Sequence, residues 1–139
     1  MAIGERPPAG PRGAIGAAGE AAATERLRDL GWLVLGRNLR VGPDELDVVA
    51  LEPGRPPTLV IVEVRSRTGS RFGAAAESVD DRKVARLYRA TMALRRVGHP
   101  TIDPELTGLT SWRVDLVTMG RRQDGAWAVE GHLRGLAPP

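Results

Sequence analysis

Residues 44–67 read DELDVVALEPGRPPTLVIVEVRSR, and this stretch decides the fold. Two runs rich in β-branched residues, 45–51 and 58–64, are typical of buried strands, and the EPGRPP between them predicts a loop. Both strands nevertheless carry carboxylates, among them Asp47 and Glu63. Burying an ionised carboxylate without a partner is unfavourable, so these two acids need a physical reason.

The two strands predict an antiparallel hairpin centred on Arg55. In this register Asp47 lies directly opposite Glu63, and Glu45 lies opposite Arg65. Opposed residues have Cβ atoms about 4.5–5.5 Å apart. Two carboxylates at that distance repel each other unless a proton or a cation lies between them.

A divalent cation is the simpler explanation of the acidic pair. Carboxylate oxygens are hard ligands that suit Mg²⁺ or Mn²⁺, and Mg²⁺ usually takes only one or two carboxylates besides water and phosphate oxygens. Glu20 lies on the inward face of a predicted helix, from which it could reach the cation, and Arg65 would place a positive charge beside it. In the alternative, Asp47 pairs with Arg65 or Arg37 on a sheet face open to water.

The composition narrows the classes of function. The chain of 139 residues has no cysteine, which excludes disulfides, thiolate metal sites and a cysteine nucleophile, and we expect a cytoplasmic protein. Its longest apolar run, LVIVEV, is too short to cross a membrane. All but one of the 20 basic residues are arginine, whose planar donor groups suit phosphate. With a formal charge of +3, the chain is compatible with a nucleic-acid partner.

The remaining predicted elements surround this hairpin. In chain order the sequence predicts a helix over 16–30, strands over 32–41, 45–51 and 58–64, a helix from a capping box at Ser78 and Asp81 to about Val97, and strands over 110–119 and 126–133. This order predicts one α/β domain, 14–136, with a mixed sheet flanked by helices. Residues 1–13 are expected to form a flexible lead-in, and 137–139 a tail.

Several short motifs run through most of the chain: GxxGE (16–20), RNxR (37–40), ELDVVA (45–50), VEVRSR (62–67), FG (72–73), VDDRKVARL (79–87) and WRVDLV (112–117). With them the sequence resembles the PD-(D/E)xK nuclease superfamily and, more closely, the YraN-like family of small bacterial proteins, relatives of archaeal Holliday junction resolvases. This resemblance implies a restriction-endonuclease-like core in which Asp47 and Glu63 bind Mg²⁺ or Mn²⁺ and Glu20 is an auxiliary acid. It also implies hydrolysis of phosphodiester bonds in DNA.

One position departs from the superfamily pattern, because Arg65 stands where the motif has lysine. Arginine stays protonated and cannot act as a base, but it can bind a phosphate and stabilise charge in the transition state. Two alternatives follow. Either Arg65 contributes to catalysis only through its positive charge, or the catalytic activity is weakened or lost. Lys83, the chain's only lysine, is a third candidate, since it lies in the first turns of the second predicted helix and could reach the site. A solvated lysine without a role is the alternative.

Arginines close to the proposed site in the sequence are the predicted phosphate contacts, or else a solvated rim: Arg37, Arg40, Arg67 and Arg71. The two histidines, His99 and His132, lie too far apart to form a metal motif, and we expect both at the surface or an edge. Asp115 shares a strand face with Arg113 and is expected to pair with it.

Three hypotheses about function follow. The leading one is a Mg²⁺- or Mn²⁺-dependent, endonuclease-like enzyme that acts on branched or nicked DNA. The second is a nucleic-acid-binding module whose catalysis is weak or lost because Arg65 replaces the motif lysine. The third is a structural partner in a larger assembly. The sequence leaves the oligomeric state open; a homodimer is one alternative, since resolvase-like enzymes often need two active sites and an edge strand offers a dimer surface.

Overall fold

The computed structural model describes residues 10–67 and 79–139, with side chains over 16–66 and 79–139. Its helices and strands are α1 (Gly10–Asp29), β1 (Leu33–Val41), β2 (Asp44–Glu52), β3 (Thr58–Arg67), α3 (Asp81–Val97), α4 (Pro104–Thr107), β4 (Trp112–Arg121) and β5 (Trp127–Leu133). Among the described helices, none is long and apolar enough to cross a membrane.

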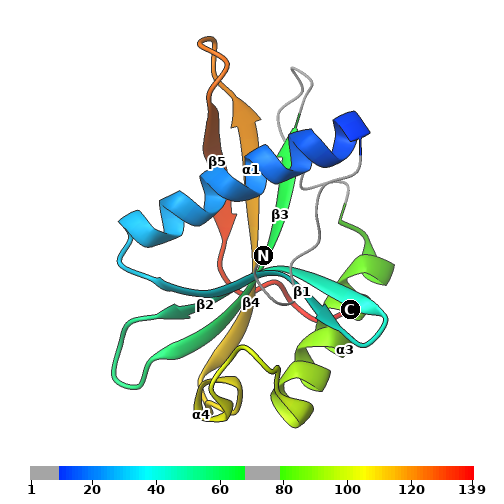
Figure 1. The fold of residues 1–139 in the computed structure, drawn as a ribbon, viewed down its shortest axis with the longest axis vertical. Coiled ribbons are helices and arrows are strands. Elements are labelled where there is room, and N and C mark those ends of the chain that lie inside the picture. Colours follow the sequence, from blue (N-terminus) through cyan, green and yellow to red (C-terminus); the bar gives the residue numbers. More distant parts are fainter. Residues whose placement is uncertain (1–9, 68–78) are drawn as a thin grey trace.

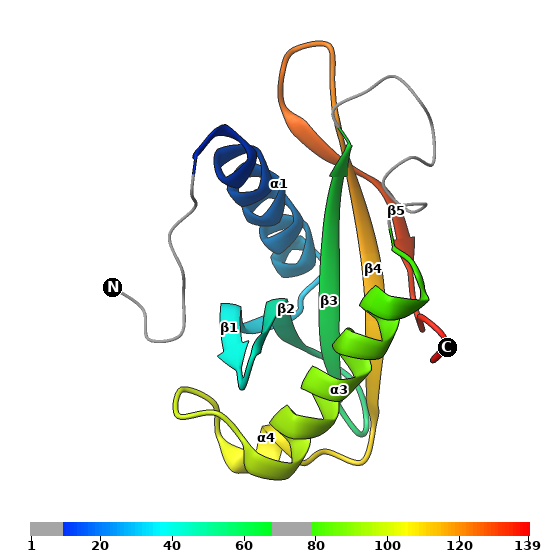
Figure 2. The same ribbon diagram turned by 90° about the vertical axis from the view of Figure 1, so that its right-hand side faces the viewer.

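The five strands form one sheet in chain order, β1-β2-β3-β4-β5. Neighbouring strands are antiparallel except β3 and β4, which are parallel and are connected through α3. Figure 1 shows α1 lying across β3, β4 and β5, and Figure 2 shows α3 on the other side of the sheet. The α/β class with a mixed sheet flanked by helices, predicted from the sequence, is therefore confirmed.

Each face of the sheet carries its own hydrophobic core. Ala23 and Leu27 of α1 belong to one core together with Val62 of β3. Leu87 and Leu94 of α3 belong to the other, together with Ile61. Because Ile61 and Val62 are consecutive, the alternation of side chains along β3 supplies both cores. β3 is thus buried on both faces, and a polar side chain near its middle lies inside the protein.

The predicted hairpin register is confirmed where the strands pair, residues 48–52 with 58–62, whereas the predicted pair of Glu45 and Arg65 lies beyond the end of this pairing. β2 and β3 pair Val48 with Val62, which is the register that sets Asp47 against Glu63. The loop between the strands, with its glycine and prolines, ends β2 at Glu52 and lets β3 begin at Thr58. The two acids therefore come from neighbouring strands at matching positions.

α1 is longer than the sequence predicts. It begins at Gly10 rather than Gly16, so residues 10–13 belong to a helix and not to the predicted lead-in. Gly10, Pro11 and Gly13 have low helix propensity, which is why the sequence pattern does not predict these turns. Proline is tolerated there because it stands in the first turn, where its missing N–H has no helical partner to lose.

α3 begins at Asp81 with a different cap from the one predicted. The side chain of Asp80 accepts a hydrogen bond of 3.0 Å from the backbone N–H of Lys83, which makes Asp80 the N-cap. The predicted capping box began at Ser78, which lies outside the described residues. This cap fixes the start of the helix and thereby the position of Lys83.

Candidate active site

β2 and β3 separate beyond Val48, and the candidate site lies where they part. Their pairing ends at Val48 and Val62, whereas β3 continues beside β4 as far as Arg67. The backbone N–H of Val64 donates a hydrogen bond of 2.9 Å to Oδ2 of Asp47. The Asp47 carboxylate thus replaces a backbone carbonyl and lies between the two strands, at a fork.

α1 approaches this fork closely because a glycine stands at the contact. A Cβ atom built on Gly19 would lie 2.0 Å from Oγ of Ser66 in β3, closer than a side chain permits. The next residue, Glu20, reaches Asp47 and hydrogen-bonds with its carboxyl group. Asn38 of β1 also hydrogen-bonds Glu20, from a left-handed backbone conformation (φ 49°) that asparagine tolerates. The sequence motifs GxxGE and RNxR thus both serve to place Glu20, a role of Gly19 and Asn38 that their spacing alone does not reveal.

The carboxyl groups of Glu20, Asp47 and Glu63, here called the acidic cluster, affect one another's protonation. Burial is the main reason that the pKa of Glu63 rises to about 9, since only 3% of this residue is exposed, and the negative charge of Asp47 adds to the rise. Burial likewise raises the pKa of Glu20 to about 8, again with a contribution from Asp47. At neutral pH Glu20 and Glu63 therefore each hold a proton, and Asp47 lies hydrogen-bonded between them. Without a cation, protons hold the acidic cluster together.

Basic residues surround the acidic cluster. Nζ of Lys83 lies 3.5 Å from Oε2 of Glu63, so α3 brings the chain's only lysine to the site. The positive charges of Lys83 and Arg65 lower the pKa of Glu63 against the larger effect of burial, and Arg37 has the same effect on Glu20. The Nε atoms of Arg65 and Arg37 are buried without a hydrogen-bond partner. Buried donors without a partner are unfavourable, and an oxygen of a bound anion is one kind of acceptor that would satisfy them.

The alternative pairing of Asp47 with an arginine does not form. Within residues 16–66 and 79–139, no ion pair joins Asp47 to Arg65 or Arg37. Its carboxylate instead contacts the N–H of Val64 and the carboxyl groups of the acidic cluster. The two arginines thus keep donor capacity that the fold does not use.

The predicted phosphate contacts do not all lie together. Arg37 lies at the acidic cluster, whereas Arg40 is exposed further along β1, opposite Glu45 of β2. The side chain of Arg67 and the whole of Arg71 lie outside the described residues, so their roles stay predictions.

The acidic cluster contains the ligand type that Mg²⁺ and Mn²⁺ prefer. Asp47 and Glu63 supply two carboxyl groups at the fork, and Mg²⁺ usually takes one or two from a protein. Across the part of the chain that the structure describes, no group of three or more aspartate, glutamate, histidine or cysteine side chains is arranged to hold a metal ion. The pair therefore fits a cation that completes its coordination with water and substrate oxygens.

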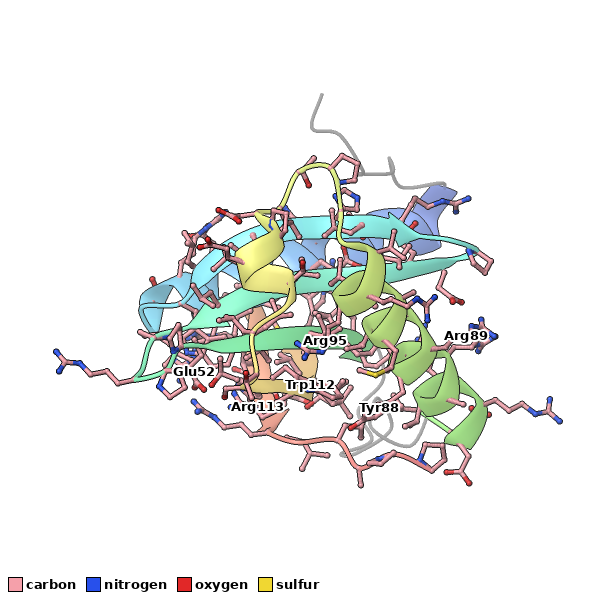
Figure 3. The ribbon with its side chains drawn as sticks, turned by 90° about the horizontal axis from the view of Figure 1, so that it is seen from below. Glu52, Tyr88, Arg89, Arg95, Trp112 and Arg113 are labelled. Atoms are coloured by element: carbon pink, nitrogen blue, oxygen red, sulfur yellow. The ribbon has the colours of Figure 1, made fainter. Side chains whose placement is uncertain are left out.

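A second polar cluster ties the C-terminal residues to the sheet. Buried Asp115 accepts hydrogen bonds from Nε of Arg113 at 2.7 Å and from Nε2 of His132 at 2.8 Å. The backbone N–H of Gly135 donates a third, at 3.0 Å. Burial raises the pKa of Asp115, but these hydrogen bonds outweigh burial and hold the pKa below its usual value. Figure 3 shows Arg113 beside Glu52, to which it also donates a hydrogen bond.

The contacts of Asp115 test two predictions made from the sequence. The predicted pair of Arg113 and Asp115 is confirmed. His132 lies on β5, an edge strand of the sheet, as predicted, but it is half-buried and is the partner of a buried carboxylate rather than an ordinary surface residue. The pairing of β4 with β5 brings the two residues together, and no local pattern encodes it.

The fold and the acidic cluster define a small α/β protein whose candidate site is a strand fork lined with carboxyl groups. The model of the family described as "Uncharacterised protein family UPF0102" matches residues 19–119, a range that contains the whole acidic cluster and Lys83. The chain belongs to family UPF0102, the family of the YraN-like proteins that its sequence resembles.

Relatives within this family are similar over most of their length. The UPF0102 protein of Deinococcus radiodurans is 45% identical over 107 residues, which cover 75% of this chain and 85% of that protein. That of Acidothermus cellulolyticus is 37% identical over 128 residues, covering 89% and 93%. That of Mycobacterium tuberculosis is 35% identical over 124 residues, covering 88% and 91%.

Among solved structures, Pyrococcus furiosus SfsA in complex with Ca²⁺ is similar to this chain with a TM-score of 0.37 and 16% identity. The match covers 84% of this chain and 61% of SfsA, so the chain spans about three fifths of that protein's length. A likeness at this level is too low to assign a shared function.

Proposed function

We propose that the protein is a Mg²⁺- or Mn²⁺-dependent endonuclease that hydrolyses phosphodiester bonds in DNA, with branched or nicked DNA as its substrate. The observation that carries this proposal is the acidic cluster, buried at a strand fork beside Lys83 and Arg65. Carboxyl groups buried so close together oppose folding, so a function explains them better than stability does. The resemblance to the PD-(D/E)xK superfamily supports the same chemistry.

A Mg²⁺ or Mn²⁺ ion held by Asp47 and Glu63 would, when bound, supply Lewis acidity to water and to a phosphate oxygen. The protein's own groups do the rest. Arg65 and Arg37 have buried Nε donors without partners, so they bind and orient the scissile phosphate. Glu20 holds a proton at neutral pH, which makes it an acid that can donate a proton within the site.

Lys83 supplies the ammonium that the motif position lacks. Arg65 cannot accept a proton near neutral pH, whereas a lysine ammonium is a compact charge that can orient water or lose a proton. Nζ of Lys83 lies 3.5 Å from Glu63, although it comes from α3 and not from β3. We assign the positioning of water beside Glu63 to Lys83, and the binding of phosphate to Arg65.

Cleavage of supercoiled plasmid and of synthetic nicked and branched DNA in Mg²⁺ or Mn²⁺ tests this proposal. We expect the wild type to cut, and Asp47→Asn to cut about 100-fold more slowly or less, because a group that stabilises the transition state is lost. Asp124→Asn, in the exposed turn between β4 and β5, is the matched control and should cut at the wild-type rate. A wild type that cuts none of these substrates would contradict the proposal.

A second function has its own support. Arg65 at the motif position favours a nucleic-acid-binding module with weak or lost catalysis, because arginine cannot act as a base. Such a module would bind DNA with salt-dependent affinity and cut nothing in Mn²⁺. Either function on DNA is consistent with a cytoplasmic location. A nuclease that needs two sites would also form a homodimer, which sedimentation would detect.

A further inference from the structure

The positive charge of the chain is concentrated on α3. This helix carries six basic residues and one acidic residue, so its net charge of +5 exceeds the +3 of the whole chain. The rest of the sequence is therefore net negative by two. A polyanion is therefore attracted to the side of the protein that carries α3.

Most of these charges lie on the side of α3 that faces away from the sheet. Val84, Leu87 and Leu94 face the core. The exposed residues at helical spacing on the opposite side form what we call the arginine row: Arg82, Arg86, Arg89 and Arg96. Figure 3 shows Arg89 pointing outward, whereas Arg95 points inward to Trp112, with its guanidinium 5.0 Å from the ring centre.

A cleft of about 590 Å³ lies between the C-terminal half of α3 and the turn between β1 and β2. Three arginines and a histidine line the cleft, and we call them its rim: Arg40, Arg89, Arg96 and His99. Its walls include aliphatic side chains: Val41, Pro43, Ala93 and Val97. Asp44 also lines the cleft, but Arg89 neutralises its carboxylate with hydrogen bonds of 2.6 and 3.0 Å. The cleft thus combines aliphatic side chains with two further arginines, Arg40 and Arg96.

The cleft and the acidic cluster lie along the same helix, α3. Arg89 holds the pKa of Asp44 below its usual value, and the charges of Arg86 and Lys83 act in the same direction, so these groups lie near one another. Lys83 in turn lies 3.5 Å from Glu63. From Lys83 to Arg96 the helix rises about 20 Å, at about 1.5 Å per residue. A strand cut at the acidic cluster could therefore follow α3 into the cleft.

We propose that this cleft binds a single-stranded segment of the DNA that is cut at the acidic cluster, so that the substrate carries an unpaired arm beside the cut site. A cleft of this volume matches small-molecule sites and accepts a nucleotide or two, whereas a double helix reaches only its rim. Unpaired bases can pack on the aliphatic walls and on guanidinium or imidazole planes while their phosphates face the arginines. The inference rests on the proposed function, because it names the form of that substrate.

Three variants separate the effect of the charge of the cleft from the effect of its shape. Arg40→Ala/Arg96→Ala removes two rim charges, and Arg26→Ala/Arg55→Ala removes two exposed charges elsewhere. Ala93→Gln fills the cleft without changing its charge. Each is compared with the wild type by fluorescence anisotropy, using oligo(dT), a blunt duplex and a duplex with an oligo(dT) arm, in Ca²⁺ at several salt concentrations.

We expect the wild type to bind oligo(dT) and the armed duplex more tightly than the blunt duplex. The rim variant should bind oligo(dT) about tenfold more weakly or worse, and its salt dependence should fall by about 1.4 in log–log slope, since two phosphate contacts are lost. Ala93→Gln should weaken binding to oligo(dT) but not to the blunt duplex. The control variant should bind like the wild type, apart from a small loss of general attraction.

Equal affinity for the blunt and armed duplexes, or equal losses in the rim and control variants, would overturn the inference. So would tight binding to anionic lipid vesicles with none to oligo(dT), or a preference for oligo(rU). If the rim variant loses oligo(dT) but no DNA is cut in Mn²⁺, the cleft assignment stands and the endonuclease proposal fails. If cleavage depends on Asp47 while the rim variant cuts the armed duplex at the wild-type rate, the endonuclease proposal stands and the cleft assignment fails.

Discussion

The buried carboxyl group of Glu63 should limit the stability of the metal-free protein. Its pKa rises from 4.5 to about 9 on folding, so the folded chain binds this proton more tightly than the unfolded chain does. The stabilisation from the proton is complete below pH 4.5 and is lost as the pH rises through 9. The loss is about 1.4 kcal/mol per pH unit, which amounts to about 3 kcal/mol at pH 7.

Glu63→Gln removes this titration and keeps the size of the side chain. We expect the variant to match the wild type in stability near pH 4, and to be more stable by up to about 3 kcal/mol at pH 7. It should also lose metal-dependent cleavage, as expected where a functional group opposes stability. Urea unfolding in EDTA, followed by tryptophan fluorescence between pH 4 and pH 8, measures the difference.

Glu105→Gln in α4 is the control, because Glu105 is exposed and the same chemical change there should leave the stability difference small at every pH. The reasoning fails if the Glu63→Gln variant is less stable than the wild type at pH 8. It also fails if the gap between the two proteins does not widen as the pH rises.

Further expectations concern the basic residues. Arg65→Lys should increase the rate of DNA cleavage if arginine at this position lowers the catalytic rate. An unchanged rate would mean that this residue does not take part in the chemistry. Lys83→Met should slow cleavage about 100-fold or more while DNA affinity falls only slightly, and equal losses in both would make Lys83 a binding residue instead. Arg113→Met leaves buried Asp115 with fewer partners and should lower the free energy of unfolding by about 3 kcal/mol, whereas a loss below about 1 kcal/mol in urea would show that His132 suffices.

The acidic pair could be predicted from the sequence because local rules determine it. The glycine and prolines of the loop centre the hairpin, and the two-residue period of a strand then sets the face of every side chain. The approach of Glu20 follows from helical periodicity, which places it on the inward face of α1. Each of these inferences needs only residues within one element or one hairpin.

The positions of Lys83 and His132 depend on long-range packing instead. Whether Lys83 reaches Glu63 depends on where α3 begins and how it lies on the sheet, and Asp80 rather than the predicted residue caps this helix. His132 meets Asp115 through the pairing of β4 with β5. The cleft also depends on long-range packing. It is formed by α3 and a turn that lie far apart in the sequence, so no sequence motif predicts it.

A crystal soaked in Mn²⁺ gives the simplest test of the acidic cluster, since anomalous scattering locates manganese without ambiguity. We expect one ion in contact with carboxylate oxygens of both Asp47 and Glu63, and no such ion in Glu63→Gln. Two carboxyl groups that keep their mutual hydrogen bond, with no ion beside them at saturating Mn²⁺, would contradict a metal-dependent site.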